Sequence, residues 1–141
     1  MTDAPKSPRK AKRILLIHGD DTERTRLAEH LESRGFEVLQ SGRARTGLLQ
    51  AANQNVDVIV LDLDAPDAEG FETLGKFRKG AQTKLLPILL LSQMHHRADL
   101  QQAAALGAAG FIKKPVDLGN LLRKIRRILA PITRRTGLTM P

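Results

Sequence analysis

The chain has 141 residues and no cysteine, which fits one domain with a substantial core and excludes disulfide and thiolate chemistry. Its formal net charge of +8 is concentrated at the ends: residues 1–13 carry +4, residues 113–141 carry +7, and the body between them carries −3. No apolar run approaches the ~20 residues of a membrane helix, and no signal-peptide pattern opens the chain. We therefore expect a cytoplasmic protein that makes no membrane contact.

The basic ends admit two interpretations: contact with nucleic acid or an acidic partner, or simple solvation. The chain has no Trp, no Tyr and four Phe, so it offers no aromatic platform for stacking on single strands. It also lacks zinc-finger spacing and a clear helix-turn-helix. We favour solvated ends and do not expect direct nucleic-acid contact. We expect a flexible basic arm at 1–12, a folded domain at 13–130, and a flexible basic tail at 131–141.

Short apolar strands alternate with amphipathic helices along the body. The expected strands are 13–17, 36–39, 56–61, 86–91 and 109–112. The expected helices are one that leads from a polar turn at 18–22 to Gly35, and then 46–52, 69–79, 98–106 and 117–129. In the second helix we expect Leu48, Leu49 and Ala52 to face inward. This alternation indicates an α/β fold whose parallel sheet is covered on both faces.

An acidic loop follows the third strand. The apolar, β-branched residues 56–61 lead into Asp62 and Asp64, and a turn with Pro66 and Gly70 comes next. Open α/β sheets bind their ligands at the carboxyl ends of the strands. A carboxylate fixed at such an end can bind a metal, accept a group covalently, or do both.

Three other strands also end in polar residues. The first strand ends at His18, the fourth at Ser92, and the fifth just before Lys114. Because parallel strands point the same way, these ends converge on one edge of the sheet with Asp62. An acid, a hydroxyl and a lysine together suit a phosphoryl group, which Asp62 would accept while Ser92 and Lys114 bind its oxygens.

On these residues the chain resembles the receiver domain of two-component response regulators. The resemblance covers roughly residues 13–129, and its motifs are Leu61-Asp62, Ala65-Pro66, Glu69-Gly70, the segment from Pro87 to Ser92, Gly107-Ala108, and the segment from Phe111 to Pro115. The resemblance implies a flavodoxin-like (βα)5 fold, in which a doubly wound five-stranded parallel sheet has the order 2-1-3-4-5.

The resemblance also implies roles for single residues. Asp62 would be the phosphoacceptor, served by a histidine kinase or phosphotransfer protein and by Mg²⁺. Ser92 would be the switch hydroxyl, Phe111 the aromatic ring that turns inward with it, and Lys114 the motif lysine, joined to Pro115 by a cis peptide. The face formed by the fourth helix, the fifth strand and the last helix would contact a downstream protein or a second copy. Such a domain assists its own phosphorylation at most and is not otherwise an enzyme.

The chain departs from this family where the metal would sit. Counting without gaps places His18 and Gly19 at the two positions where the family has adjacent metal-binding acids. Asp20 could swing into the site, and Asp64 could supply another carboxylate; alternatively, useful phosphorylation is lost. For Asp20 we favour a role as N-cap of the first helix over one as a metal ligand.

These departures leave two alternative functions open. The first is a pseudo-receiver that acts as a protein-interaction module without phosphorylation, and the second is a nucleic-acid-associated protein that uses its basic termini. Gln93 is a further departure, because the position after the hydroxyl is usually small in the family. Its longer amide could crowd the phosphoryl entry or donate a hydrogen bond to the phosphoryl group.

Overall fold

The computed structural model describes residues 11–64, 71–93 and 96–131. Most of the expected basic arm and tail therefore lies outside the described residues, as do the motif residues from Ala65 to Gly70. The domain limits and the flexibility of the ends stay predictions. Within the described ranges, no helix has both the length and the apolar character needed to cross a membrane.

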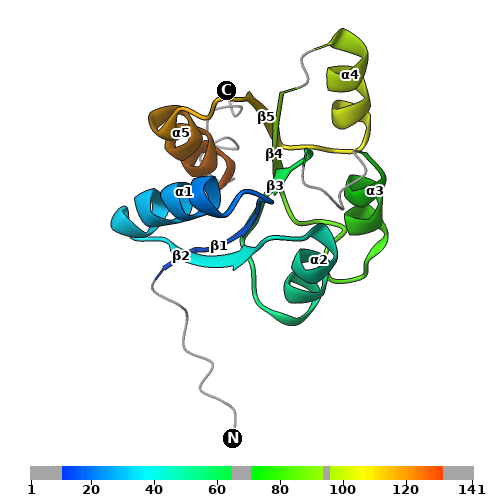
Figure 1. The fold of residues 1–141 in the computed structure, drawn as a ribbon. Coiled ribbons are helices and arrows are strands. Elements are labelled where there is room, and N and C mark those ends of the chain that lie inside the picture. The colour runs from blue at the N-terminus through cyan, green and yellow to red at the C-terminus, as the bar shows by residue number, and fades with distance from the viewer. Residues whose placement is uncertain (1–10, 65–70, 94–95, 132–141) are drawn as a thin grey trace, which may run out of the picture.

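Five strands and five helices alternate along the described residues (Figure 1). The strands are β1 Arg13–Ile17, β2 Glu37–Ser41, β3 Val58–Asp62, β4 Ile88–Ser92 and β5 Gly110–Lys113. The helices are α1 Asp21–Ser33, α2 Ala44–Asn53, α3 Phe71–Lys79, α4 Arg97–Ala105 and α5 Leu118–Ile128. Each expected element is present, with ends that differ by a few residues.

The strands form one parallel sheet in the order β2-β1-β3-β4-β5, which confirms the expected topology. In this register Ile17 lies opposite Leu61, Asp62 opposite Leu91, and Ser92 opposite Lys113. Every residue of β3 and β4 is buried, as expected of central parallel strands covered on both faces. The register brings the carboxyl ends of β1, β3, β4 and β5 to one edge.

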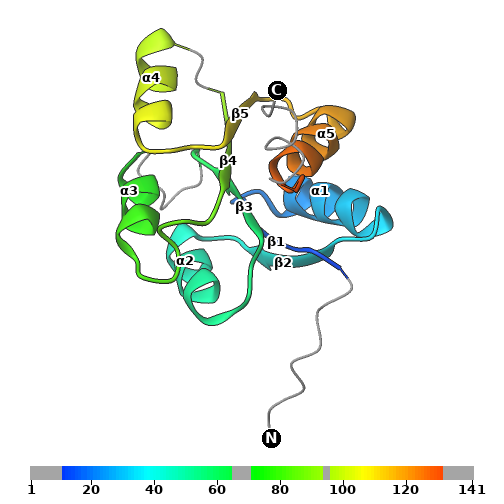
Figure 2. The same ribbon diagram turned by 180° about the vertical axis from the view of Figure 1, so that it is seen from behind.

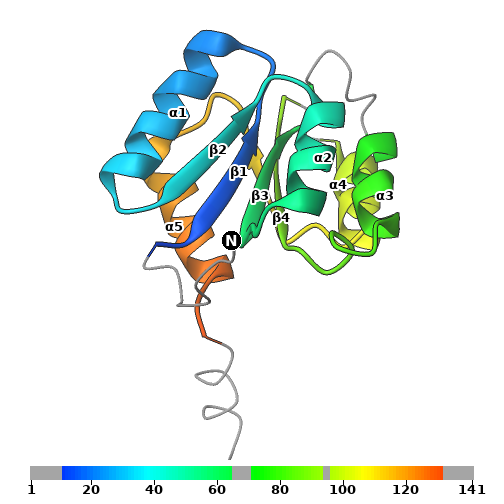
Figure 3. The same ribbon diagram turned by 90° about the horizontal axis from the view of Figure 1, so that it is seen from below.

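Helices cover both faces of the sheet. Figures 1 and 2 show α1 and α5 on one side and α2, α3 and α4 on the other, and Figure 3 shows the sheet between these two layers. Alternate residues of each strand supply the two cores: Leu15 packs on the α2–α4 side and Leu16 on the α1–α5 side. Each fully buried leucine contributes roughly 1.5–3 kcal/mol, so this burial holds the strand ends in place.

The α2 helix buries a different face from the one expected. Its buried residues are Ala44, Gly47 and Ala51. Leu48 and Ala52 are half-buried, but Leu49 is 59% exposed, so the prediction that Leu49 faces inward was wrong. The reason is the close approach of Gly47 to β1, where a β-carbon would collide with the side chain of Ile17. This contact turns Leu49 outward.

Arg78 binds together the edge of the sheet that lies away from the strand carboxyl ends. From α3, its guanidinium donates hydrogen bonds of 2.8–3.0 Å to the carbonyls of Lys84, Leu86, Leu106 and Gly107. Burial lowers the pKa of Arg78, although a guanidinium stays charged in proteins. One side chain thus connects the α3–β4 loop with the turn between α4 and β5.

Candidate functional site

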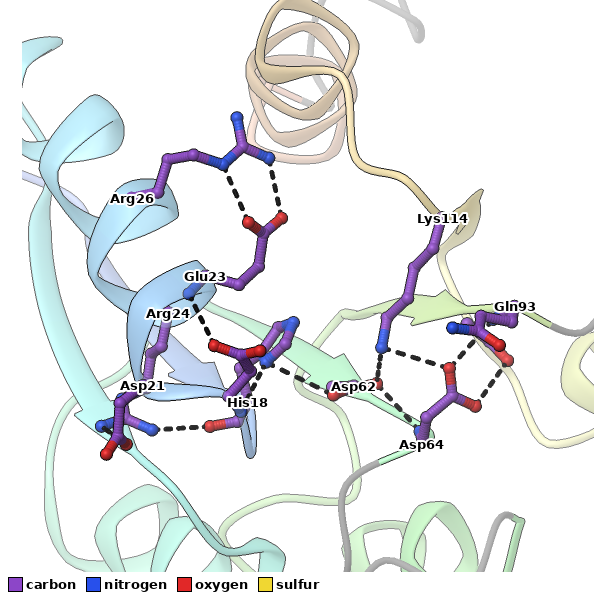
Figure 4. Close-up of polar contacts among 11 residues, drawn as sticks. His18, Asp21, Glu23, Arg24, Arg26, Asp62, Asp64, Gln93 and Lys114 are labelled. Carbon is purple, nitrogen blue, oxygen red and sulfur yellow. Dashed lines mark hydrogen bonds and ion pairs between the residues drawn. The ribbon is translucent and has the colours of Figure 1, made fainter.

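A pocket of about 670 Å³ opens at the carboxyl ends of the strands. Its polar lining comes from α1, the end of β3 and the segments that follow β1, β3, β4 and β5, and includes His18, Asp20, Arg26, Asp62, Asp64 and Lys114. Figure 4 shows His18, Asp62, Asp64 and Lys114 around the end of β3. The structure therefore brings Asp62 and Lys114 together, as the sequence predicted, and Ser92 lies next to them at the end of β4.

Asp62 is the last residue of β3, and its side chain is only 4% exposed. The ammonium of Lys114 donates to Asp62 Oδ1 at 2.7 Å, and the backbone N–H of Asp64 donates to the same oxygen at 2.9 Å. Partial burial alone would lower the pKa of Lys114, but the carboxylates of Asp62 and Asp64 outweigh it and raise that pKa. The pocket thus holds a charged lysine against a buried carboxylate.

The backbone places Lys114 at this carboxylate. Its N–H donates to the Ser92 carbonyl at 2.9 Å, which continues the pairing of β4 and β5 beyond the strand end. The Lys114–Pro115 peptide is cis, as expected from the family resemblance. Lys114 is therefore fixed to the same edge as Asp62 by main-chain contacts as well as by its charge.

Asp64 connects three strands. Its Oδ1 accepts a hydrogen bond from Ser92 Oγ at 3.1 Å, and its Oδ2 accepts one from the backbone N–H of Gln93 at 3.0 Å. The same Oδ2 lies 3.1 Å from Lys114 Nζ. Partial burial would raise the pKa of Asp64, but the Gln93 N–H and Lys114 outweigh it and hold that pKa below its usual range. The sequence suggested Asp64 as a carboxylate but not these partners.

His18 follows directly after β1 and lies on the other side of Asp62. Its ring is buried, and Nδ1 lies 3.4 Å from Asp62 Oδ2 and accepts the backbone N–H of Asp20 at 3.1 Å. Burial is the main cause that lowers the pKa of His18, and Lys114 lowers it further against the opposing effect of Asp62. The lowered pKa favours the neutral ring, whose Nδ1 acts as an acceptor toward the Asp20 N–H.

Asp20 is the N-cap of α1, as the sequence favoured. Its Oδ1 accepts the backbone N–H of Glu23 at 3.0 Å, and this hydrogen bond is the main cause that lowers the pKa of Asp20. Glu23 in turn forms two hydrogen bonds of 2.8 and 2.7 Å with Arg26, which also donates to the Val116 carbonyl at 3.0 Å. The three-residue spacing of Glu23 and Arg26 is the signal that could have predicted their ion pair, whereas no sequence pattern indicates the contact with Val116.

The side chains of the pocket do not fit Mg²⁺. This ion demands a nearly octahedral shell of oxygen ligands. In the ranges that the structure describes, no three His, Cys, Asp or Glu side chains are grouped so that they could hold a metal. His18 and Gly19 replace the expected acids, Asp20 caps α1, and Asp64 is directed at other donors. The geometry gives no support to the metal roles expected of Asp62, Asp20 and Asp64.

The two expected switch residues lie on neighbouring strands. Ser92 is fully buried, and its hydroxyl donates to Asp64 Oδ1. Phe111, on β5, is half-buried and packs against the core on the α2–α4 side of the sheet. The switch roles of Ser92 and Phe111 stay predictions.

Sequence comparison identifies relatives over most of the chain. Residues 14–126 match the family model of the response regulator receiver domain. Protein PilH of Pseudomonas aeruginosa is 30% identical over 118 residues, which cover 84% of this chain and 98% of PilH. The KDP operon transcriptional regulatory protein KdpE of Escherichia coli is 30% identical over 128 residues, which are 91% of this chain but 54% of KdpE. The chain thus spans nearly all of the first relative and about half of the second.

Structure comparison agrees with the sequence comparison. The chemotaxis response regulator CheY4 of Vibrio cholerae superposes with a TM-score of 0.79 at 29% identity, over 85% of this chain and all of CheY4. The non-phosphorylated HemR receiver domain of Leptospira biflexa gives a TM-score of 0.77 at 30% identity, over 85% of this chain and 95% of that domain. These comparisons favour neither the pseudo-receiver nor the nucleic-acid interpretation.

Proposed function

The chain belongs to the response regulator receiver domain family, and from this premise we propose that Asp62 is the residue that accepts the phosphoryl group. Receiver domains are in general signalling domains rather than enzymes. They interact with histidine kinases or phosphotransfer proteins and with downstream partners, and they typically bind Mg²⁺ at an acidic pocket. A phosphoryl-accepting role in signalling fits this chain. The residue assignments below extend that role.

One observation carries the assignment: Asp62 is a buried carboxylate at a strand end, paired with Lys114 Nζ at 2.7 Å and open to a pocket. Phosphoryl transfer depends mainly on positioning and on stabilising the negative charge of the transferred group. Lys114 supplies positive charge at the reacting carboxylate. Because the residues present do not fit Mg²⁺, Lys114 is the main positive charge with which this chain itself can stabilise the transferred phosphoryl group.

The proposed transfer is a displacement at phosphorus. An Asp62 carboxylate oxygen attacks the phosphorus of a phosphohistidine in line with the departing nitrogen. An O–P bond forms and the N–P bond breaks, which leaves an acyl phosphate on Asp62. The bonding electron pair returns to the donor imidazole, which takes up one proton. Lys114 stays within reach of both Asp62 and the new phosphoryl oxygens, and Ser92 donates its hydroxyl to one of them.

We propose the face formed by α4, β5 and α5 as the output surface. On α5, Leu121, Leu122 and Ile125 are buried, while Arg123, Arg126 and Arg127 are exposed. Such a basic stripe suits an acidic protein surface, and like charges oppose a symmetric contact between two copies. A homodimer through this face therefore stays a weaker alternative. The identity of the kinase is open, and a cytoplasmic location stays a prediction from the sequence.

Incubation with acetyl phosphate, followed by intact-mass spectrometry and peptide mapping, tests the assignment. We expect one added phosphoryl group on the wild type and none on Asp62→Asn, because an amide cannot form the acyl phosphate. Asp57→Asn is the matched control, since Asp57 lies before β3 and contacts the backbone of Arg13 at the opposite edge. A wild type that gains no phosphoryl group, or an Asp62→Asn variant that still gains one, would contradict the proposal.

A further inference from the structure

The carboxylate of Asp64 is bound by a set of donors that comes from two other strand ends. These are the Ser92 hydroxyl at 3.1 Å, the Gln93 backbone N–H at 3.0 Å, and the Lys114 ammonium at 3.1 Å. Both carboxylate oxygens are engaged. Figure 4 shows Asp64 directed toward Gln93 and Lys114, with Asp62 beside it. This is a complete anion-binding cradle, already filled by a side chain of the protein.

The same donors are those that a phosphoryl group on Asp62 needs. A phosphoryl group presents three anionic oxygens, and a hydroxyl, a backbone N–H and an ammonium are its usual partners. Lys114 contacts both Asp62 at 2.7 Å and Asp64 at 3.1 Å, so the cradle adjoins the proposed acceptor. The Asp64 backbone N–H also binds Asp62 Oδ1 at 2.9 Å, which fixes the two residues in one turn.

We propose that Asp64 is a resident anion that occupies this cradle until Asp62 is phosphorylated, and that the phosphoryl group must displace the Asp64 carboxylate from Ser92, Gln93 and Lys114. This inference rests on the proposed role of Asp62. It makes Asp64 a positioning residue that acts on the reaction through its three donors. The contacts of Asp64 stabilise the unphosphorylated protein, so Asp64 opposes phosphorylation.

Charge and tethering both support the displacement. Two carboxylates already share the Lys114 ammonium, and a phosphoryl group adds further negative charge to the same few ångströms. On phosphorylation the Asp62 carboxylate becomes the uncharged acyl part of the acyl phosphate, so the phosphoryl group and the Asp64 carboxylate then compete for Lys114. Asp64 is also only two residues from Asp62, so the chain itself holds its carboxylate next to the cradle. An external anion must therefore compete with a tethered one.

The experiment measures anion binding where Asp62 chemistry is absent. Inorganic phosphate is titrated into Asp62→Asn and into Asp62→Asn/Asp64→Ala, and the amide shifts of Gln93 and Lys114 are followed by NMR. We expect Asp64→Ala to tighten phosphate binding at least about tenfold, within the usual range of coupling between two ligands. Asp64→Asn keeps an acceptor oxygen without the charge and should give an intermediate gain in phosphate affinity. It replaces the alanine variant in this test if that variant folds poorly.

Asp20→Asn in the same background is the matched control. It removes one negative charge from the same pocket but touches neither Ser92 nor Lys114, and asparagine also caps helices. We expect a change of less than about twofold, as for most surface changes. Equal or weaker phosphate binding after Asp64→Ala would overturn the inference, and so would an equal gain in the Asp20 variant.

This outcome is separable from the proposed function. If acetyl phosphate fails to modify Asp62 but Asp64→Ala still tightens phosphate binding, the role of Asp64 in the cradle is supported and the assignment of Asp62 as acceptor is contradicted. If Asp62 is phosphorylated but Asp64→Ala leaves phosphate binding unchanged, the assignment of Asp62 as acceptor is supported and the role of Asp64 in the cradle is contradicted. With Asp62 intact, the inference further predicts faster modification of Asp64→Ala than of the wild type by acetyl phosphate, and an unchanged rate counts against it.

Discussion

The two sides of the pocket differ in how closely they follow the receiver family. The β3–β5 side, comprising Asp62, Asp64, Ser92 and Lys114, joins an acid, a hydroxyl and a lysine through contacts of 2.7–3.1 Å. The β1 side, comprising His18, Gly19 and Asp20, presents a neutral ring, a residue without a side chain, and a helix cap. Phosphoryl-binding groups are thus present on one side, while metal-binding groups are lacking on the other.

This difference shows that the two parts of such a site can change separately. The β3–β5 side is held by mutual ion pairs, so loss of one member leaves a buried charge without a partner. The β1 side is held mainly by local hydrogen bonds, in which His18 accepts the Asp20 N–H and Asp20 accepts the Glu23 N–H. His18 still contacts Asp62 Oδ2 at 3.4 Å, so we expect only substitutions at Gly19 and Asp20 to leave the acceptor geometry unchanged.

The largest expected effect comes from removal of the charge that joins the β3–β5 side. Lys114→Ala leaves the carboxylates of Asp62 and Asp64 close together without a cation, and we expect it to lower the free energy of unfolding by about 2–3 kcal/mol. Urea denaturation measures this change. Lys113→Ala, at an exposed neighbour, should cost no more than about 0.5 kcal/mol. Similar losses in the two variants would show that the ion pairs contribute little.

Placing acids at the two positions where the family has its metal-binding pair should give the β1 side affinity for Mg²⁺. In the double variant His18→Asp/Gly19→Asp, carboxylates stand beside Asp62, and we expect Mg²⁺ affinity to rise roughly tenfold or more, because hard cations bind through carboxylate oxygens. Amide shifts near Asp62 during an Mg²⁺ titration measure this affinity, and an added Asp62→Ala change should abolish the gain. If the wild type already binds Mg²⁺ as tightly as the double variant, the contrast between the two sides is wrong.

Removal of the helix cap should have a smaller and purely structural effect. Asp20→Ala leaves the Glu23 N–H without its acceptor, and we expect a modest loss of unfolding free energy, as for the loss of a single helix cap. Asp117→Ala is the matched control, since Asp117 caps α5 through the Asn120 N–H at 2.8 Å, and its cost should be similar. Phosphorylation by acetyl phosphate should keep its rate in the Asp20 variant. A large loss of phosphorylation there would assign Asp20 to the chemistry.

The smallest effect concerns the pH dependence of His18. Its pKa in the folded protein lies below the ordinary value of 6.5, so the unfolded chain binds more protons between these two values. Stability should therefore fall as the pH drops below 6.5, and level off once the folded ring is also protonated. NMR titration of the ring measures the pKa, and His18→Gln should remove this part of the slope. A ring that titrates above 6.5 would contradict the buried neutral assignment.

The sequence predicted the fold and the meeting of Asp62, Ser92 and Lys114 for one physical reason. Parallel strands end at a common edge, so residues that follow them must converge. The link from Asp64 to Gln93 was not predictable, because the direction of a loop side chain follows from packing and not from spacing. The inward face of α2 was misassigned for a related reason: the contact between Gly47 and Ile17 depends on backbone proximity that no hydrophobic pattern reports.

The four hydrogen bonds of Arg78 have a consequence for α4. Two of them hold the carbonyls of Leu106 and Gly107, just past the C-terminal end of α4, whereas Ala103 is the only buried residue along the helix itself. The end near Gly107 is thus anchored, while the opposite end of α4 follows the segment that begins at Ser92 and Gln93. We therefore expect any movement of α4 to be smallest at its end near Gly107, where Arg78 holds the backbone.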